Sequence, residues 1–362
     1  MRKPLEGAKR ISGPYPYYGA SGIVDYVDGY LFDEELILLS EDGANITDRN
    51  YPVCFLASGK YWVNNHAHVL RTKQGNENNF ICNSLERKDY TQYNTGMAMP
   101  KLNKETCKKI PILCPGFEEQ KKIGDYFRSL DNLITLHQRK CEETKKLKKF
   151  MLQKMFPKKG EKVPEIRFGG FTDDWEQRKL NEIADKVSEK NKNNEFSEPF
   201  TNSAEQGIIS QKDYFDREIV NNENLNGYYI VRNDDFIYNP RISATAPVGP
   251  INRNRLGRNG VMSPLYTVFR THDIDNLYLE FYFKTTKWHR FMKLNGDSGA
   301  RFDRFTISST QFMEMPIPYP TLEEQQKIGE YFESLDTLIT LHQHKCEELQ
   351  NIKKFMLQNM FI

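Results

Sequence analysis

Two short segments of the chain, 241–245 and 252–258, are dense in side chains that can hydrogen-bond to nucleic-acid bases. Arginine can form a bidentate contact with guanine and asparagine with adenine, while serine and threonine can bind phosphates or either base edge. Between residues 241 and 304 there are eleven Lys or Arg against five Asp or Glu, although the whole chain carries a net charge of only +2. We predict that these loops, with a third at 297–304, face DNA. The candidate residues are Arg241, Ser243, Thr245, Asn252, Arg253, Asn254, Arg255, Arg258, Arg301 and Arg304.

The first half of the chain offers fewer such side chains. Asp42 lies in the segment Ser40–Asn45, where a carboxylate could accept a hydrogen bond from the cytosine amino group. The same segment can also be a plain Asp/Gly turn between strands, just as any single arginine above can be a phosphate anchor or a surface charge. Tyr18 is a further candidate DNA contact, in a rigid aromatic turn that Pro and Gly predict for Gly13–Gly19.

Catalytic motifs are missing from the sequence. There is no GxxxxGK followed by Ser or Thr, so we expect no P-loop. Ile237-Tyr238-Asn239-Pro240 resembles the Asn-Pro-Pro-aromatic motif of adenine methyltransferases only faintly, and no glycine-rich cofactor loop accompanies it. The six cysteines form no CxxC pair and have no nearby histidine at metal-ligand spacing. We therefore expect a non-enzymatic chain without a cofactor or a metal ion.

Composition is that of a globular protein of two domains. The chain is 38% hydrophobic and 28% charged, with a mean hydropathy of −0.70. No apolar run approaches the ~20 residues that cross a bilayer, and the N-terminal residues lack the apolar core of a signal peptide. We expect a cytoplasmic location, with reduced cysteines and no membrane contact.

One long segment occurs twice and must position whatever the loops bind. Residues 115–157 return as 320–362 at a constant offset of 205, with about 30 identities in 43 positions. Apolar or small residues alternate four and three apart, which is the seam of a coiled coil. The seam residues are Ile123, Phe127, Leu130, Ile134, His137, Cys141 and Thr144, and in the second copy Ile328, Phe332, Leu335, Ile339, His342, Cys346 and Leu349. Each copy therefore needs a surface on which to bury its seam, either the helix of the other copy or the domain to which it belongs.

The repeat and its flanking motifs resemble the specificity subunit of type I restriction–modification systems. The likeness rests on the EEQ-KIG-YF-SLD-LITLHQ-K helix, the KKFMLQ-MF tail and FGGFTDDWEQRKL at Phe168–Leu180, and it covers nearly the whole chain. It implies two target-recognition domains held apart on DNA by two antiparallel helices. It also implies a bipartite, asymmetric target, with methylation of adenine or cleavage carried out by partners. Those partners would be methyltransferase subunits, two of them, and ATP-dependent restriction subunits.

The predicted fold class is α+β, with two mixed α/β recognition domains, each followed by a long helix of a coiled coil. We expect the first domain at 1–110, the first helix at 111–157, the second domain at 158–315 and the second helix at 316–362. Only 114 residues precede the first repeat, whereas 162 lie between the repeats. Because the first domain has no counterpart of FGGFTDDWEQRKLNEIA, we expect it to be N-terminally shortened, as in a recombined gene.

Within these domains the apolar runs predict individual elements. Strands are expected at 23–27, 36–40, 53–57, 66–71, 228–232, 235–239 and 265–270, and helices at 78–90, 175–187 and 277–294. The helix tails, 150–156 and 355–361, are rich in Phe and Met and could either dock a partner protein or each pack on the opposite recognition domain.

Two alternatives to DNA recognition by an active subunit remain open. A coiled-coil scaffold whose two domains bind proteins would explain the repeat but not the Arg/Asn loops. A silent or shuffled, truncated specificity variant would explain the short first domain.

Overall fold

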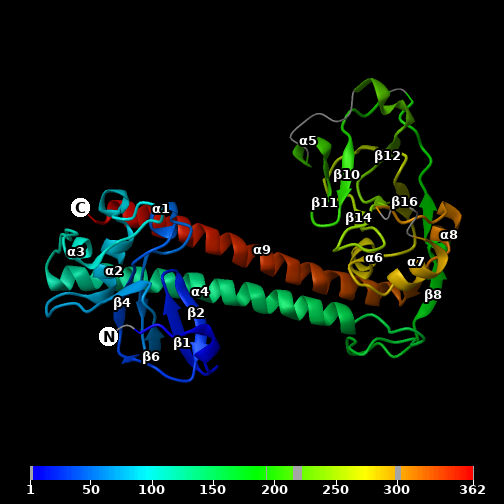
Figure 1. Cartoon of the computed structure of the whole chain (residues 1–362). Coiled ribbons are helices and arrows are strands. Elements are labelled where there is room, and N and C mark those ends of the chain that lie inside the picture. Colours follow the sequence, from blue (N-terminus) through cyan, green and yellow to red (C-terminus); the bar gives the residue numbers. More distant parts are fainter. Residues whose placement is uncertain (1–2, 193, 215–221, 298–302, 362) are drawn as a thin grey trace. The chain divides into compact units, whose positions relative to one another are not determined.

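The computed structural model describes residues 3–192, 194–214, 222–297 and 303–361 (Figure 1). The chain divides into two compact units, unit 1 (Met1–Lys140 and Leu341–Ile362) and unit 2 (Cys141–Thr340). Each unit combines a mixed α/β head with part of both long helices, α4 (Phe117–Lys154) and α9 (Leu322–Asn359). Among the described residues, no helix is long and apolar enough to span a membrane, and no cluster of His, Cys, Asp and Glu could hold a metal ion.

The head of unit 1 contains two sheets. The first has the order β2-β1-β6-β3, in which only β1 and β6 run parallel, and the second is antiparallel with the order β5-β4-β7. All five residues of the central strand β4 are buried, as expected for a strand covered on both faces. The elements are η1 (Gly7–Lys9), β1 (Tyr15–Gly19), β2 (Gly22–Val27), β3 (Phe32–Asp33), β4 (Leu36–Ser40), α1 (Asn45–Asp48), β5 (Cys54–Ala57), β6 (Lys60–Val63), β7 (Ala67–Leu70), α2 (Asn78–Glu86), η2 (Thr91–Tyr93) and α3 (Lys104–Cys107).

The head of unit 2 is built around the antiparallel sheet β14-β13-β16-β9, with three two-stranded sheets, β10-β11, β12-β15 and β17-β8, beside it. Its elements are β8 (Glu176–Lys179), η3 (Leu180–Glu182), β9 (Ala184–Lys186), β10 (Phe200–Ser203), β11 (Gly207–Ser210), α5 (Gln211–Tyr214), η4 (Asn222–Gly227), β12 (Tyr229–Val231), β13 (Phe236–Tyr238), β14 (Ile251–Arg253), β15 (Gly260–Met262), β16 (Thr267–Thr271), α6 (Asn276–Phe283), α7 (His289–Asn295), α8 (Ser309–Met313) and β17 (Pro316–Tyr319).

The two heads share a framework that their sequences hide. In unit 1, β4 lies between β5 and β7 and α2 follows β7. In unit 2, β13 lies between β14 and β16 and α6 follows β16. Both helices begin at an acidic N-cap, because Glu77 accepts from the Phe80 amide at 2.5 Å and Asp275 from the Tyr278 amide at 2.8 Å. The equivalent elements are therefore β4 and β13, β5 and β14, β7 and β16, and α2 and α6.

All seven predicted strands are present, with ends that differ by at most two residues. Three other predictions are wrong. Residues 175–187 form β8, η3 and β9 instead of a helix, because pairing with β17 and β16 outweighs local helix propensity. Tyr15–Gly19 is strand β1 instead of part of a turn. The helix expected at 277–294 is two helices, α6 and α7, and the Thr285 hydroxyl donates to the Tyr282 carbonyl at the break.

The long helices pair antiparallel within each unit, which confirms the coiled coil. In unit 1, Lys353 binds Asp131 at 2.5 Å and the Cys346 thiol donates to the Ile134 carbonyl at 3.6 Å. In unit 2, the equivalent Lys148 binds Asp336 at 2.5 Å and the Cys141 thiol donates to the Ile339 carbonyl at 3.9 Å. The two copies of the seam therefore face each other, and neither copy is enclosed by one head alone.

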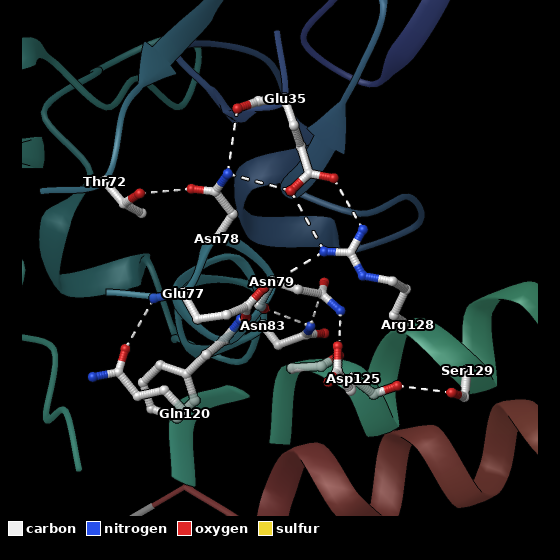
Figure 2. A network of polar contacts seen from close by, with 12 residues as sticks. Glu35, Thr72, Glu77, Asn78, Asn79, Asn83, Gln120, Asp125, Arg128 and Ser129 are labelled. Carbon is white, nitrogen blue, oxygen red and sulfur yellow. Dashed lines mark hydrogen bonds and ion pairs between the residues drawn. The ribbon is translucent and has the colours of Figure 1, made fainter. Parts of the chain in front are cut away.

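In both units the head is joined to the long helices through the same three residue types, a glutamine, a glycine and a phenylalanine. In unit 1, Figure 2 shows Gln120 of α4 accepting from the Glu77 amide at 3.1 Å, where α2 begins. Gly124, one turn later, lets the same end of α2 approach, since a Cβ there would lie 2.1 Å from a Glu77 oxygen. Phe361 closes the joint and contacts the rings of Phe80 and Phe127 at 5.2 and 5.7 Å.

Unit 2 repeats this joint with the equivalent residues. Gln325 accepts from the Asp275 amide at 2.9 Å, and a Cβ at Gly329 would lie 2.7 Å from the Leu277 Cβ. Phe156 packs between Tyr278 and Phe332, with ring centroids 5.5 and 6.2 Å away. Each Phe/Met tail thus ends against a head, as one of the two expectations for the tails had it.

Candidate nucleic-acid interface

The loop that leaves the central strand of each head is held by one isolated β-bridge. In unit 1 the bridge joins Asp42, just after β4, to Lys101. In unit 2 it joins Arg241, just after β13, to Arg304. Backbone hydrogen bonds flank both bridges in the same pattern, from Gly43 to Pro100 at 3.0 Å and from Ile242 to Asp303 at 2.9 Å. The two loop pairs therefore occupy equivalent places on equivalent strands.

The first position of each bridge carries opposite charge, Asp42 in unit 1 and Arg241 in unit 2, whereas the second position is a cation in both, Lys101 and Arg304. In unit 1, Asp42 is half-buried and lies 2.8 Å from Nδ1 of His66, and exposed Lys101 stands across the bridge. In unit 2, two exposed arginines stand across the bridge, and no ion pair to either one exists among the described residues. Two neighbouring cations that are not ion-paired within the described residues favour an anionic partner such as a phosphate or the acceptor edge of guanine.

The unit 2 loop also borders a hollow of about 430 Å³. Arg241, Ser243 and Thr245 are exposed on its rim, and the hairpin between β10 and β11 forms another wall. The loop is preorganised, because Ser243 and Ala246 exchange backbone hydrogen bonds and Asn239 accepts from the Arg241 amide at 2.9 Å. A base edge or a phosphate could therefore be bound without ordering the loop first.

The two predicted asparagines lie inside the head. Asn252 is 4% exposed, donates to Asn202 at 2.7 Å, and belongs to strand β14, which corrects the expectation that 252–258 is all loop. Asn254 is fully buried and donates to the carbonyls of Arg232 and Arg258 at 2.9 and 3.0 Å. Their amides are occupied by protein groups, so their part in this structure is to hold the loops.

Three predicted arginines are tied to acidic residues. Arg253 and Arg255 bind Glu280 at 3.0 and 2.8 Å, and Arg255 also binds Glu333 of α9 at 2.9 Å. Arg258 forms a bidentate pair with Glu198, which lowers the pKa of that carboxyl. These pairs leave Arg241 and Arg304 as the accessible cations among the predicted arginines within the described parts of the chain. Arg301 lies outside the described residues.

Of the two unit 1 candidates, only Asp42 reaches the loop. Tyr18 packs against Phe55 and Tyr61 with centroids 5.8 and 5.6 Å away, and burial, then Tyr26, raises the pKa of its hydroxyl. Sequence reasoning missed His66 and Lys101, which share the loop pair with Asp42. The signal for Lys101 is its segment, 94–101, which precedes the first long helix as 297–304 precedes the second, whereas no pattern in the sequence points to His66.

Arg128 of α4 secures the head that carries Asp42. Its guanidinium binds Glu35 at 2.9 Å and reaches Glu77 at 3.5 Å (Figure 2). The hydrogen bond from Arg128 lowers the pKa of Glu35. The equivalent residue of α9 is Glu333, whose pKa is lowered by its hydrogen bond from Arg255. The ion pair at this repeat position therefore has opposite polarity in the two units.

Comparison with known proteins agrees with this duplicated architecture. Residues 2–146 and 172–351 match the family "Type I restriction modification DNA specificity domain". A putative type I restriction enzyme specificity subunit of Haemophilus influenzae is 38% identical over 37% of this chain, which spans only 34% of that relative. The MjaVIII specificity subunit of Methanocaldococcus jannaschii is 25% identical, over 96% of this chain and 85% of its own length.

A solved structure carries the same fold. The type I restriction–modification S subunit from M. genitalium superposes with a TM-score of 0.63 at 14% identity, covering 100% of this chain and 92% of that one. Specificity subunits are the non-catalytic members of their systems. The repeat, the two heads and the family match together show that the chain belongs to the type I restriction–modification specificity subunits.

Proposed function

We propose that this chain reads a bipartite, asymmetric DNA site, with one head on each half-site, and so directs adenine methylation or cleavage by partner subunits. The loop pair of unit 1 reads one half through Asp42, supported by His66 and Lys101. The loop pair of unit 2 reads the other half through Arg241, Ser243, Thr245 and Arg304.

The observation that carries this proposal is the pair of equivalent bridges, in which Asp42 of unit 1 stands where unit 2 has Arg241. A carboxylate can accept from the cytosine amino group, whereas an arginine can donate to guanine O6 and N7. Two heads that present these groups from the same place on the same framework would select different bases. Two unlike half-sites on one pair of helices make the target asymmetric, with a gap set by protein geometry.

The proposed protein partners are two modification subunits and ATP-dependent restriction subunits. Support for two equivalent docking places comes from apolar side chains that are exposed in both copies of the repeat. Leu133 and Leu338 are 43% and 44% exposed, and Phe150 and Phe355 are 48% and 60% exposed. Identical exposed residues in both copies are what two copies of one partner would need.

The test is DNA binding by the chain assembled with its modification subunits, measured by fluorescence anisotropy over a series of salt concentrations. Arg241→Ala should weaken binding to random duplex and reduce the slope of log K against log salt by about 1 if the side chain contacts a phosphate. If it reads guanine instead, the loss should be confined to the cognate site, at about 1–3 kcal/mol. Arg290→Ala removes an exposed arginine of α7 and is the matched control.

A protein-binding scaffold is the competing function. Binding of the assembled complex to duplex DNA that does not depend on salt, or that Arg241→Ala and Arg304→Ala leave unchanged, would favour the scaffold over DNA recognition.

A further inference from the structure

A short strand of unit 2 receives a docked segment whose counterpart surface in unit 1 is exposed. In unit 2, β17 pairs antiparallel with β8, and Ile317 of β17 is fully buried. The same repeat positions in unit 1 are residues 111–114, which pair with no strand among the described residues. Leu113 there is 66% exposed. This edge is therefore covered by β8 in unit 2, whereas the equivalent edge of unit 1, residues 111–114, is uncovered among the described residues.

The first turns of the long helices show the same contrast. In unit 2, Arg167 forms a bidentate pair with Glu324, at 2.6 and 2.8 Å, and the Glu324 side chain is fully buried. The equivalent Glu119 of α4 is exposed, and no cation of the described residues pairs with it. The carboxylate at this repeat position is therefore ion-paired and buried in unit 2 but exposed in unit 1.

Aromatic contacts extend the comparison by two more turns. Phe168 meets the Tyr331 ring edge-on at 5.9 Å, and the Lys327 ammonium lies 4.8 Å from the Phe171 ring. Their equivalents on α4, Tyr126 and Lys122, are both exposed. We define the unit 1 edge as Lys109, Ile112, Leu113, Glu119, Lys122 and Tyr126.

We propose that the unit 1 edge docks an extended segment of a second polypeptide, which adds a strand antiparallel to residues 111–114. By equivalence with the segment 167–179, the partner carries an arginine that pairs with Glu119, followed by an aromatic residue that packs on Tyr126. A second aromatic residue lies over Lys122.

The residue of the docked strand that faces Lys109 should differ between this partner and the chain's own segment 167–179. In unit 2, Lys179 of β8 forms an ion pair with Glu314 at 2.6 Å. The residue equivalent to Glu314 in unit 1 is Lys109, so a lysine in the docked strand would face a like charge. The partner therefore carries an acidic residue there, and a second copy of this chain, with Lys179, is the poorer fit.

The test uses the full chain and fluorescein-labelled peptides of residues 164–182, read by anisotropy. The peptide with Lys179→Glu should bind saturably and more tightly than the unchanged peptide. Glu119→Arg in the chain should weaken that binding by about tenfold or more, since it opposes a like charge to the peptide's Arg167. The peptide with Arg167→Glu added should restore binding to the Glu119→Arg chain. Glu118→Arg, one residue away and also exposed, is the matched control and should change little.

Hydrogen exchange identifies where the peptide lies. In unit 2, prolines 316 and 318 have no amide to donate, so Ile317 and Tyr319 are the β17 residues that can donate to β8. Bound peptide should accordingly protect the amides of Ile112 and Cys114, while leaving that of Leu113 exchanging. Failure of the Lys179→Glu peptide to bind, or binding without protection at 112 and 114, overturns the proposal. A dimer of the chain alone that excludes the peptide assigns the edge to a second copy and also overturns it. The readout involves no DNA, so it is independent of the proposed function.

Discussion

Nδ1 of His137 lies 2.9 Å from Nδ1 of His342, and the two residues are the same position of the repeat. At this separation one ring nitrogen must donate and the other accept, so at least one imidazole is neutral. Loss of hydration, followed by the neighbouring His342, lowers the pKa of His137, and Lys140 and Lys345 add to the effect. Protonation of His137 at low pH would therefore weaken the pairing of α4 with α9 in unit 1.

Acid should loosen this pairing with a defined sign. The unfolded chain binds a proton at His137 near pH 6.5, whereas the folded chain binds it at lower pH. The unfolded state consequently holds more protons between these values, and the free energy of unfolding falls as the pH falls below about 6.5. Chemical denaturation at pH 7.5 and pH 5.5 measures the difference. The double variant His137→Gln, His342→Gln should show a smaller pH dependence, and an unchanged dependence would contradict the assignment.

Reversing the charge of Arg128 should weaken the attachment of the unit 1 head to α4 and leave unit 2 unchanged. Arg128→Glu places a carboxylate beside Glu35 and Glu77, and we expect a loss of about 1–2 kcal/mol in unit 1, since each partly exposed pair contributes roughly 0.5–1 kcal/mol. Adding Glu35→Arg should recover part of the loss. Thermal unfolding followed by hydrogen exchange assigns the change to unit 1. Equal loosening of unit 2 would mean that the joint is not local.

Replacing either glycine of the joints, Gly124 or Gly329, by alanine should destabilise the protein. Alanine normally favours a helix by about 1 kcal/mol over glycine, so a gain would be expected at an open site. At Gly329 the new methyl would instead meet the Leu277 Cβ at 2.7 Å, and we expect Gly329→Ala to destabilise unit 2 by about 1–3 kcal/mol. Gly124→Ala should destabilise unit 1 by a similar amount, because the new methyl would lie 2.1 Å from the Glu77 carboxylate, which is held as the N-cap of α2 by its hydrogen bond from the Phe80 amide. Thr135→Ala, at an exposed position of α4, is the control and should be neutral or stabilising in denaturant titrations.

The two loop pairs should control separate halves of the target. In cells that carry the chain with its partner subunits, Asp42→Ala should relax methylation at one half-site, and Arg241→Ala should relax it at the other. Each change should cost about 1–3 kcal/mol of discrimination at one base pair. Methylome sequencing reads both halves at once. A variant that alters both half-sites equally would contradict the assignment of one head to each half.

Much of the fold could be predicted because its strongest signals are local or repeated. The 4-3 seam predicted α4 and α9, and compact apolar runs such as Leu36–Ser40 predicted strands. The region after Trp175 could not be predicted, since its strand β8 exists only through pairing with β17, about 140 residues later in the chain. Residue type alone also failed to distinguish buried Asn254 from exposed Arg241, because burial depends on tertiary packing.

The candidate site was accessible to sequence reasoning only in outline. Loops rich in arginine were recognisable, but the pairing of Arg255 with Glu280 and Glu333 joins segments distant in sequence. The equivalence of Asp42 with Arg241 could not be seen either, since opposite charges at matching positions look unrelated until strands β4 and β13 are superimposed by their topology.

The polarity difference between Arg128 and Glu333 limits how far the two copies of the repeat are interchangeable. The copies match at about 30 of 43 positions, so most positions could be exchanged between them without changing the side chain. At this position, the residue of either copy placed in the other would set like charges against each other and weaken the attachment of one head. A chain built from two identical helices would therefore lose one of these two supports.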